Sequence, residues 1–188
     1  MTRILFVCHG NICRSPMAEF VMKALVKKAG LEKNFQIASA ATSTEEIGNP
    51  VYPPARRKLA EHGISCDGHS ARQLTDRDYE EYDFLIGMDQ ANLRNMRRIC
   101  GEDRAGKMHL LLSFAGRQKG LSATPDAVLE RREARERPEL SPQAETEKSA
   151  RCCGEVADPW YTGDFEATWR DVLEGCQGLL EFTEKTGA

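Results

Sequence analysis

The chain opens with a strand, a short loop and a helix start in direct succession, and this order constrains the fold most. Residues 3–8 form an apolar run, as expected of a strand that is covered on both faces. Ser15 suits the N-cap of a helix and Pro16 suits its first turn, and apolar residues then recur at helical spacing up to Gly30. A buried strand leading straight into a helix is typical of a parallel α/β sheet.

Strands and helices alternate along the rest of the chain. The predicted elements are strands at 35–41, 84–88 and 109–114 and helices at 55–62, 75–82, 90–100 and 165–182. This alternation predicts a doubly wound α/β fold, with a mostly four-stranded parallel sheet and helices on both faces. Ligands of such sheets bind beyond the carboxyl ends of the strands, which is where the loop after residue 8 lies.

Residues 117–155 break the alternation. This stretch is polar and holds eight Lys or Arg and eight Asp or Glu residues, a balance that argues against a basic nucleic-acid-binding arm. We expect residues 1–188 to form a single domain in which 117–155 is a charged, flexible insertion. A charged helix over 125–137 is one form that it could take.

Composition excludes several kinds of protein. A net charge of -3 argues against nucleic acid or an anionic membrane as the main partner, and no apolar run approaches the length of about 18 residues that membrane insertion needs. The first apolar run is too short for a signal peptide, so we expect a cytoplasmic protein. Seven cysteines make an odd count and form no CxxC pair, and the four histidines are scattered, so we expect reduced thiols, no metal and no cofactor.

The five residues between Cys8 and Arg14 form a loop of the right length to bind a tetrahedral oxyanion. Its backbone N–H groups can surround one anion, and the helix start adds positive potential there. Arg14 can hold two phosphate oxygens with its planar guanidinium, and Gly10 allows backbone angles that a side chain would forbid. The residues expected to hold the phosphate are His9, Gly10, Asn11, Ile12, Cys13 and Arg14.

The same positive potential favours the thiolate of Cys8, which is the nucleophilic form. Cys8 could then attack phosphorus and carry the phosphoryl group, while Ser15 donates a hydrogen bond to the sulfur. The alternative is a Cys8 that only closes a core strand beside a solvated Arg14. Asp158 precedes a proline in a turn, where it could donate a proton to a leaving group or cap the last helix.

Several segments resemble low-molecular-weight protein tyrosine phosphatases. They are 7–19 (Val-Cys-His-Gly-Asn-Ile-Cys-Arg-Ser-Pro-Met-Ala-Glu), 39–43, 69–73, 88–93 and 158–161, within a resemblance that covers 3–116 and 156–183. The resemblance implies hydrolysis of phosphotyrosine and small aryl phosphates through a phosphocysteine. It makes Cys8 the nucleophile, Arg14 the phosphate clamp and Asp158 the general acid and later the base that activates water.

The resemblance also implies supporting residues and a substrate wall. Asn11, Ser39 and His69 match positions that brace the phosphate loop by hydrogen bonds. Trp160 and Tyr161 match one wall for the phosphotyrosine ring.

The loop at 44–48 matches the opposite wall, but Glu45 and Glu46 stand where many relatives carry an aromatic residue. Cys13 matches a cysteine that can form a reversible disulfide with the nucleophile, although it could equally be a small packing residue.

A thioredoxin-coupled arsenate reductase of the same fold is a first alternative. That chemistry needs two further cysteines after the third strand, whereas residues 87–99 contain none and Cys100 stands alone. Cys152 and Cys153 could serve only if the insertion folded over the site.

A protein arginine phosphatase is a second alternative, but those relatives favour threonine where this chain has Ile12. A third is a phosphate-binding module without catalysis, which would be expected to have lost Cys8, Arg14 or Asp158. The expected partner is therefore a phosphotyrosine protein, with no nucleic acid and no membrane insertion, bound by a monomer or weak dimer.

Overall fold

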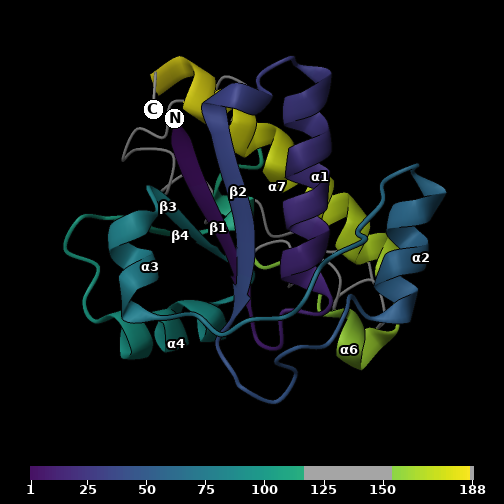
Figure 1. Ribbon diagram of the computed structural model, residues 1–188, viewed down its shortest axis with the longest axis horizontal. Helices are drawn as coiled ribbons and strands as arrows, with labels where there is room; N and C mark the ends of the chain where they lie inside the picture. Colours follow the sequence, from purple (N-terminus) through teal and green to yellow (C-terminus); the bar gives the residue numbers. More distant parts are fainter. Residues whose placement is uncertain (117–153, 187–188) are drawn as a thin grey trace, which may run out of the picture.

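A four-stranded parallel sheet forms the centre of the molecule (Figure 1). The computed structural model describes residues 1–116 and 154–186. The strands, in the spatial order β2-β1-β3-β4, are β1 (Thr2–Cys8), β2 (Phe35–Ala41), β3 (Phe84–Gly87) and β4 (Met108–Leu110). The register is parallel throughout, and β1 pairs with both β2 and β3. The predicted four-stranded parallel sheet is confirmed.

Helices cover both faces of this sheet. They are α1 (Arg14–Lys28), α2 (Pro53–Glu61), α3 (Asp76–Glu81), α4 (Gln90–Cys100), α6 (Pro159–Thr162) and α7 (Phe165–Thr186), with 3-10 turns η1 (Glu32–Asn34) and η2 (Leu111–Ser113). In Figure 1, α1 and α7 lie together on one side of the strands, and α3 and α4 lie on the other. The chain is therefore doubly wound, as its alternating elements predicted.

The apolar run of β1 is explained by burial on both faces. Ile4 and Phe6 pack among residues of α1 and α7, whereas Leu5 and Val7 pack among residues of α3 and α4. All four side chains are fully buried, because successive residues of a strand point to opposite faces. This burial holds the end of β1, and with it Cys8, in a fixed place.

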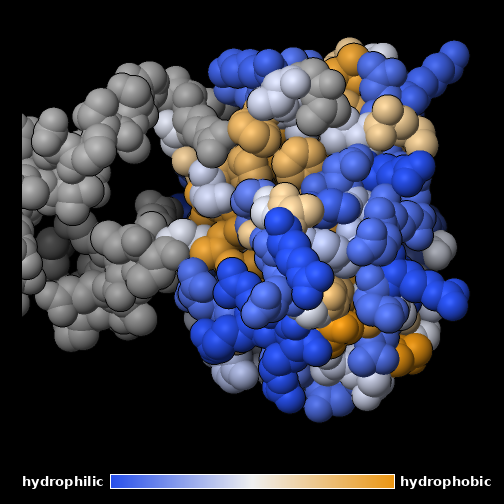
Figure 2. Space-filling model, turned by 90° about the vertical axis from the view of Figure 1, so that its left-hand side faces the viewer, coloured by the Kyte–Doolittle hydropathy of each residue, from blue (hydrophilic) through white to orange (hydrophobic). Residues whose placement is uncertain are grey.

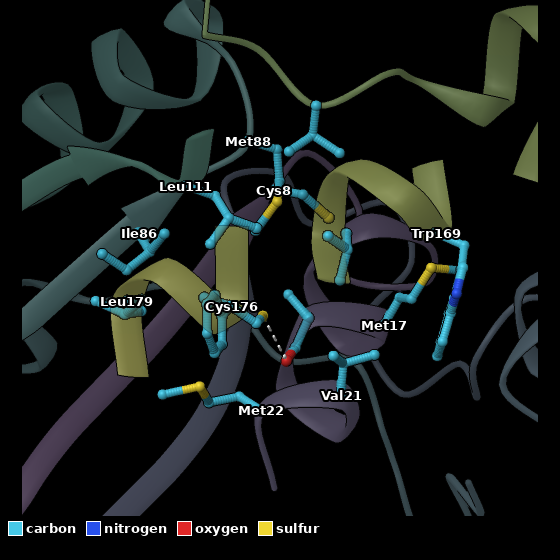
Figure 3. Packing of buried hydrophobic residues seen from close by; sticks show 14 of the residues in the cluster. Cys8, Met17, Val21, Met22, Ile86, Met88, Leu111, Trp169, Cys176 and Leu179 are labelled. Carbon is cyan, nitrogen blue, oxygen red and sulfur yellow. Dashed lines mark hydrogen bonds between the residues drawn. The ribbon is translucent and has the colours of Figure 1, made fainter. Parts of the chain in front are cut away.

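The core between α1, α7 and the sheet is closely packed around Cys176 (Figure 3). The Cys176 thiol donates a hydrogen bond of 3.6 Å to the carbonyl of Ala18 in α1. Gly178 lets α7 approach the segment after β4, since a Cβ at this position would lie 2.1 Å from the Phe114 carbonyl oxygen. The close contact explains why α7, which follows the insertion, belongs to the same core.

Several element bounds differ from the predictions by a few residues, and two of these differences have a clear physical reason. The strand predicted at 109–114 ends at Leu110, and the chain turns into η2, where the Ser113 hydroxyl bonds the Leu110 carbonyl at 2.7 Å. The first helix begins at Arg14, so Ser15 is not its N-cap. The predicted helix over 125–137, and nearly all of the predicted insertion, lie outside the described residues.

Within the described ranges, no helix is both long enough and apolar enough to cross a membrane.

Candidate active site

A cavity of about 210 Å³ opens at the carboxyl end of β1, where the chain turns into α1. Its walls come from the loop after β1, from the loop after β2 and from the segment that precedes α7. The lining residues are Cys8, His9, Gly10, Ile12, Cys13, Arg14, Glu45, Glu46, Asp158, Trp160 and Tyr161. Predicted nucleophile, phosphate loop, acid and substrate walls thus meet at one place, although 150 residues separate Cys8 from Asp158 in the sequence.

The sulfur of Cys8 has two hydrogen-bonding neighbours. The backbone N–H of Asn11 donates to Cys8 Sγ at 3.3 Å, and Ser15 Oγ lies 3.0 Å from the same atom. Donors that point at a sulfur stabilise its thiolate form. The Ser15 hydroxyl is thus directed at Cys8 instead of capping α1, which corrects the predicted N-cap role.

Asn11, and not Gly10, provides the unusual backbone angle of the loop. Its φ of 57° lies in the left-handed region, which asparagine tolerates better than most residues. Gly10 has no positive φ, so that part of the prediction is wrong; a Cβ there would instead lie 3.2 Å from Cγ of Glu46. A side chain at residue 10 would therefore displace the Glu46 side chain by a few tenths of an ångström.

The fully buried side chain of Asn11 fixes the loop from within. It donates to Ser15 Oγ at 2.9 Å and to Ser39 Oγ at 2.7 Å, and it accepts from the backbone N–H of Arg72 at 3.1 Å. The ring of His69 donates through Nε2 to the Asn11 carbonyl at 2.9 Å. The structure therefore places all three predicted supporting residues in contact with one another or with the loop.

Glu19 of α1 completes this network and was missed in the sequence. The Ser39 hydroxyl donates to Glu19 Oε2 at 2.5 Å, and Lys23 pairs with the other oxygen. His69 Nδ1 lies 3.9 Å from Glu19 Oε2. An acidic residue four positions after Ser15, on the same face of a helix, was the available signal.

Arg14 is held between two carboxylates. It lies 2.7 Å from Asp89 Oδ2 through Nη1 and 2.6 Å from Asp158 Oδ2 through Nη2, and the residue is only 4% exposed. Burial works against its charged form, but the charges of Cys8, Asp158 and Asp89 outweigh burial and raise the Arg14 pKa. Arg14 therefore stays cationic, and the two carboxylates hold its guanidinium group in a fixed orientation.

Asp89 is a second residue that sequence reasoning missed. It is the N-cap of α4 and accepts a hydrogen bond of 2.6 Å from the backbone N–H of Asn92. An aspartate directly after a strand and before a helix lies at the ligand-binding edge of a parallel sheet, and that position was its signal.

Asp158 serves two structural roles at once. One carboxylate oxygen accepts from the Trp160 backbone N–H at 3.0 Å and caps α6, while the other pairs with Arg14. The helix that it caps is α6, not the last helix, so the capping alternative named the wrong helix. Its carboxylate lies at the cavity, as a proton donor must.

The predicted substrate walls lie at the rim of the cavity. Trp160 and Tyr161 are 62% and 85% exposed, and the Trp160 ring packs against Tyr52 with 5.9 Å between centroids. Across the opening, Glu45 pairs with His9 at 3.2 Å. Exposed aromatic side chains beside a polar cavity offer stacking surface to a ligand ring.

Cys13 lines the same cavity as Cys8, and both are free thiols. Burial, together with the charges of Cys8 and Asp158, raises the pKa of Cys13 to about 12. Cys13 is therefore a neutral thiol at physiological pH. Cys8 differs from it, because the backbone N–H of Asn11 donates to the Cys8 sulfur. Nowhere in 1–116 or 154–186 do three His, Cys, Asp or Glu side chains gather as metal ligands would.

Known proteins resemble this chain along most of its sequence. The model of the low molecular weight phosphotyrosine protein phosphatase family matches residues 3–134. The chain is 44% identical over 182 residues to the low molecular weight phosphotyrosine protein phosphatase of Gallus gallus, covering 95% of this chain and 93% of the relative. It is 32% identical over 185 residues to the low molecular weight protein-tyrosine-phosphatase YfkJ of Bacillus subtilis, covering 98% and 97%.

Solved structures show the same fold. The crystal structure of YfkJ superposes with a TM-score of 0.78 at 31% identity, covering 100% of this chain and 98% of that one. The phosphatase SP-PTP of Streptococcus pyogenes gives 0.69 at 34% identity, covering 96% and 92%. The Drosophila arginine phosphatase DARP gives 0.72 at 25% identity, covering 98% of both chains. The fold alone thus does not separate tyrosine from arginine phosphatases.

Sequence matches of this extent establish membership. The chain belongs to the low molecular weight phosphotyrosine protein phosphatase family, a family of hydrolases.

Proposed function

We propose that this protein hydrolyses phosphotyrosine in proteins, and small aryl phosphates, with Cys8 as nucleophile, Arg14 as phosphate clamp and Asp158 as general acid. The observation that carries the proposal is the contact set of Cys8. Its sulfur faces the Asn11 N–H and the Ser15 hydroxyl in a cavity that Arg14 and Asp158 also line. A thiolate, a fixed cation and a carboxyl group around one cavity are what phosphoryl transfer to sulfur needs.

The reaction proceeds in two displacements. The phosphate dianion takes the place of Asp158 at Arg14 Nη2, and Cys8 Sγ attacks phosphorus while the bond to the phenolic oxygen breaks. Protonated Asp158 gives its proton to that oxygen, so the phenol leaves neutral. Asp158, now a carboxylate, takes a proton from water, whose oxygen attacks phosphorus and releases inorganic phosphate and the Cys8 thiolate. Arg14 and the loop N–H groups hold the equatorial oxygens in both steps.

The leaving group is proposed to be tyrosine. Trp160 and Tyr161 offer aromatic surface at the rim, and Ile12 presents an apolar side chain to the cavity where arginine phosphatases favour threonine. A panel of phosphotyrosine and phosphoarginine peptides tests this choice. Turnover of phosphoarginine peptides alone would contradict it.

Two variants test the roles of the catalytic residues. Cys8→Ser should abolish turnover of para-nitrophenyl phosphate while inorganic phosphate still binds. Asp158→Ala should slow aryl phosphates more steeply as the leaving phenol becomes more basic, because only a basic leaving group needs the proton. Retained turnover in the first variant, or equal losses across phenols in the second, would contradict these roles.

We further propose a single domain that spans residues 1–188, with 117–155 as an insertion that chemistry does not need. Packing of α7 against α1 supports it, because these helices lie on either side of the insertion in sequence. Free thiols at five described cysteines fit a reducing compartment such as the cytoplasm. Sedimentation should find a monomer or weak dimer, and a variant lacking 117–155 should keep turnover of small substrates.

A further inference from the structure

A second cavity lies next to the candidate active site, where α4 meets the phosphate loop. It has a volume of about 320 Å³, and its lining residues are His9, Thr42, Asn95, Arg98 and Ile99. His9 lines both cavities and stands between them. The three α4 residues recur at spacings of three and four, so a single face of this helix forms one wall.

Two polar side chains that line this cavity carry hydrogen-bond donors without a protein partner among the described residues. Arg98 is exposed and Asn95 is half-buried. Neither side chain makes a hydrogen bond or an ion pair within the part of the chain that the structure describes. An amide and a guanidinium that are accessible and have no such partners suit a ligand that accepts hydrogen bonds.

The charge around the cavity favours an anion. Helix α4 carries Arg94, Arg97 and Arg98 and no acidic residue, although the whole chain has a net charge of -3. Figure 2 views the side of the molecule on which Figure 1 shows α3 and α4, and hydrophilic residues dominate the lower part of this face. The nearby carboxylate of Glu45 lines the other cavity and is paired with His9 at 3.2 Å. The wall that α4 contributes therefore carries one positive charge, at Arg98, and no negative charge.

The backbone ties this cavity closely to the nucleophile. The Thr42 N–H donates to the Cys8 carbonyl at 2.9 Å, and the Ser43 N–H donates to the His9 carbonyl at 3.0 Å. Thr42 therefore lies directly beside the residue that carries the reacting sulfur. An extended peptide advances about 3.3 Å per residue, so a side chain only a few positions from the phosphotyrosine can reach the neighbouring cavity, which shares His9 with the first.

We propose that the second cavity binds the carboxylate of an Asp or Glu that flanks the phosphotyrosine in the protein substrate. Arg98 supplies the charged contact, and the Asn95 amide donates to a carboxylate oxygen. The proposal rests on the proposed phosphatase activity, because the phosphotyrosine in the first cavity positions the peptide. It adds a preference for acidic sequences to that activity.

The test compares Arg98→Gln with the matched control Arg97→Gln, an exposed arginine of the same helix that does not line the cavity. Substrates are phosphotyrosine peptides that carry Glu or Gln at successive flanking positions, with para-nitrophenyl phosphate as the small substrate. In wild type and in Arg97→Gln, kcat/KM should favour the acidic peptide about three- to tenfold at one position or more. Arg98→Gln should lose this preference and keep para-nitrophenyl phosphate turnover, and added salt should weaken the preference in wild type.

A second variant, Asn95→Ala, removes the amide that lines the cavity and should reduce the same preference. Equal kcat/KM for the acidic and neutral peptides in wild type would overturn the proposal. So would an equal loss on both peptides in Arg98→Gln, or an identical loss in Arg97→Gln. Failure of wild type to turn over any of these phosphate esters would instead contradict the phosphatase activity itself, and this proposal with it.

Discussion

Asn11 combines a left-handed backbone with a buried side chain that bonds Ser15, Ser39 and Arg72. Asn11→Gly keeps the backbone angle without strain but loses these bonds, so we expect unfolding free energy to fall by about 2–4 kcal/mol. Asn11→Ala loses the same bonds and adds a strained φ, which costs about 1 kcal/mol more. Urea unfolding of both variants measures the difference. Equal stability of the two would show that the positive φ carries no cost.

Cys13 and Cys8 line one cavity, yet they should differ sharply in reactivity. Because the pKa of Cys13 is raised to about 12, less than one part in a thousand is thiolate at pH 8. The sulfur of Cys8 instead accepts from the Asn11 N–H and faces the Ser15 hydroxyl. Iodoacetamide at pH 7 should therefore modify Cys8 and spare Cys13, as mass spectrometry of peptides would detect.

Inorganic phosphate is the control for this labelling, because an anion in the loop should slow modification of Cys8 and leave the other thiols as they were. Equal labelling of Cys8 and Cys13 would contradict the predicted difference.

The residues of the site were predictable only where the chain itself brings them together. The spacing of Cys8 and Arg14 between a strand and a helix is local, so the sequence contains it. Glu19 and Asp89 act through contacts with Ser39 and Arg14, across 20 and 75 residues. No periodicity encodes such distances, and the resemblance to a family was needed to bring Asp158 to the same place.

Helices and strands, like the site residues, were predictable where the signal is local in sequence and not where it comes from distant contacts. Strand β2 and helix α4 have the predicted bounds, because an apolar run and a C-terminal glycine are local signals. The fourth strand was predicted too long, since Leu111, read as strand, packs below α7 next to Gly175. Packing of a distant helix, which one window of sequence cannot contain, decides where β4 ends.

Gly178 offers a test of that packing at the level of the element. Alanine is favoured over glycine in a helix by about 1 kcal/mol, so Gly178→Ala would stabilise an isolated α7. Here the new Cβ would lie 2.1 Å from the Phe114 carbonyl oxygen and 2.7 Å from its carbon, and backbone cannot rotate away. We therefore expect a net loss of about 3 kcal/mol or more in urea unfolding.

Gly175→Ala is the matched control within the same helix. Its Cβ would meet Cγ of Leu111 at 2.5 Å, a side-chain atom that can shift, and the Leu111 carbonyl oxygen at 3.1 Å. The loss should be smaller than in Gly178→Ala. A reversed order would contradict the view that the backbone of the turn after β4 limits the approach of α7.

At the scale of the whole molecule, buried thiols make stability depend on alkaline pH. Burial is the largest cause that raises the pKa of four of them: Cys13 to about 12, Cys100 to about 11, and Cys66 and Cys176 also upward. In the unfolded chain these thiols ionise near about 8.5. Above that pH the unfolded state holds fewer protons than the native state, so the free energy of unfolding falls as pH rises.

Cys176→Ala isolates the contribution of one thiol to this pH dependence. Cys176 is fully buried beside Ala18 between α1 and α7 (Figure 3), so its loss should cost about 1–2 kcal/mol at pH 7. Between pH 9 and pH 10.5, however, the variant should lose stability less steeply than wild type, by up to about 1.4 kcal/mol per pH unit. Val172→Ala, also fully buried in α7, should be destabilised but keep the wild-type slope. Urea unfolding across this pH range, with a reductant present, measures the stability of both variants. Parallel slopes for Cys176→Ala and wild type would show that the Cys176 thiol does not contribute to the pH dependence.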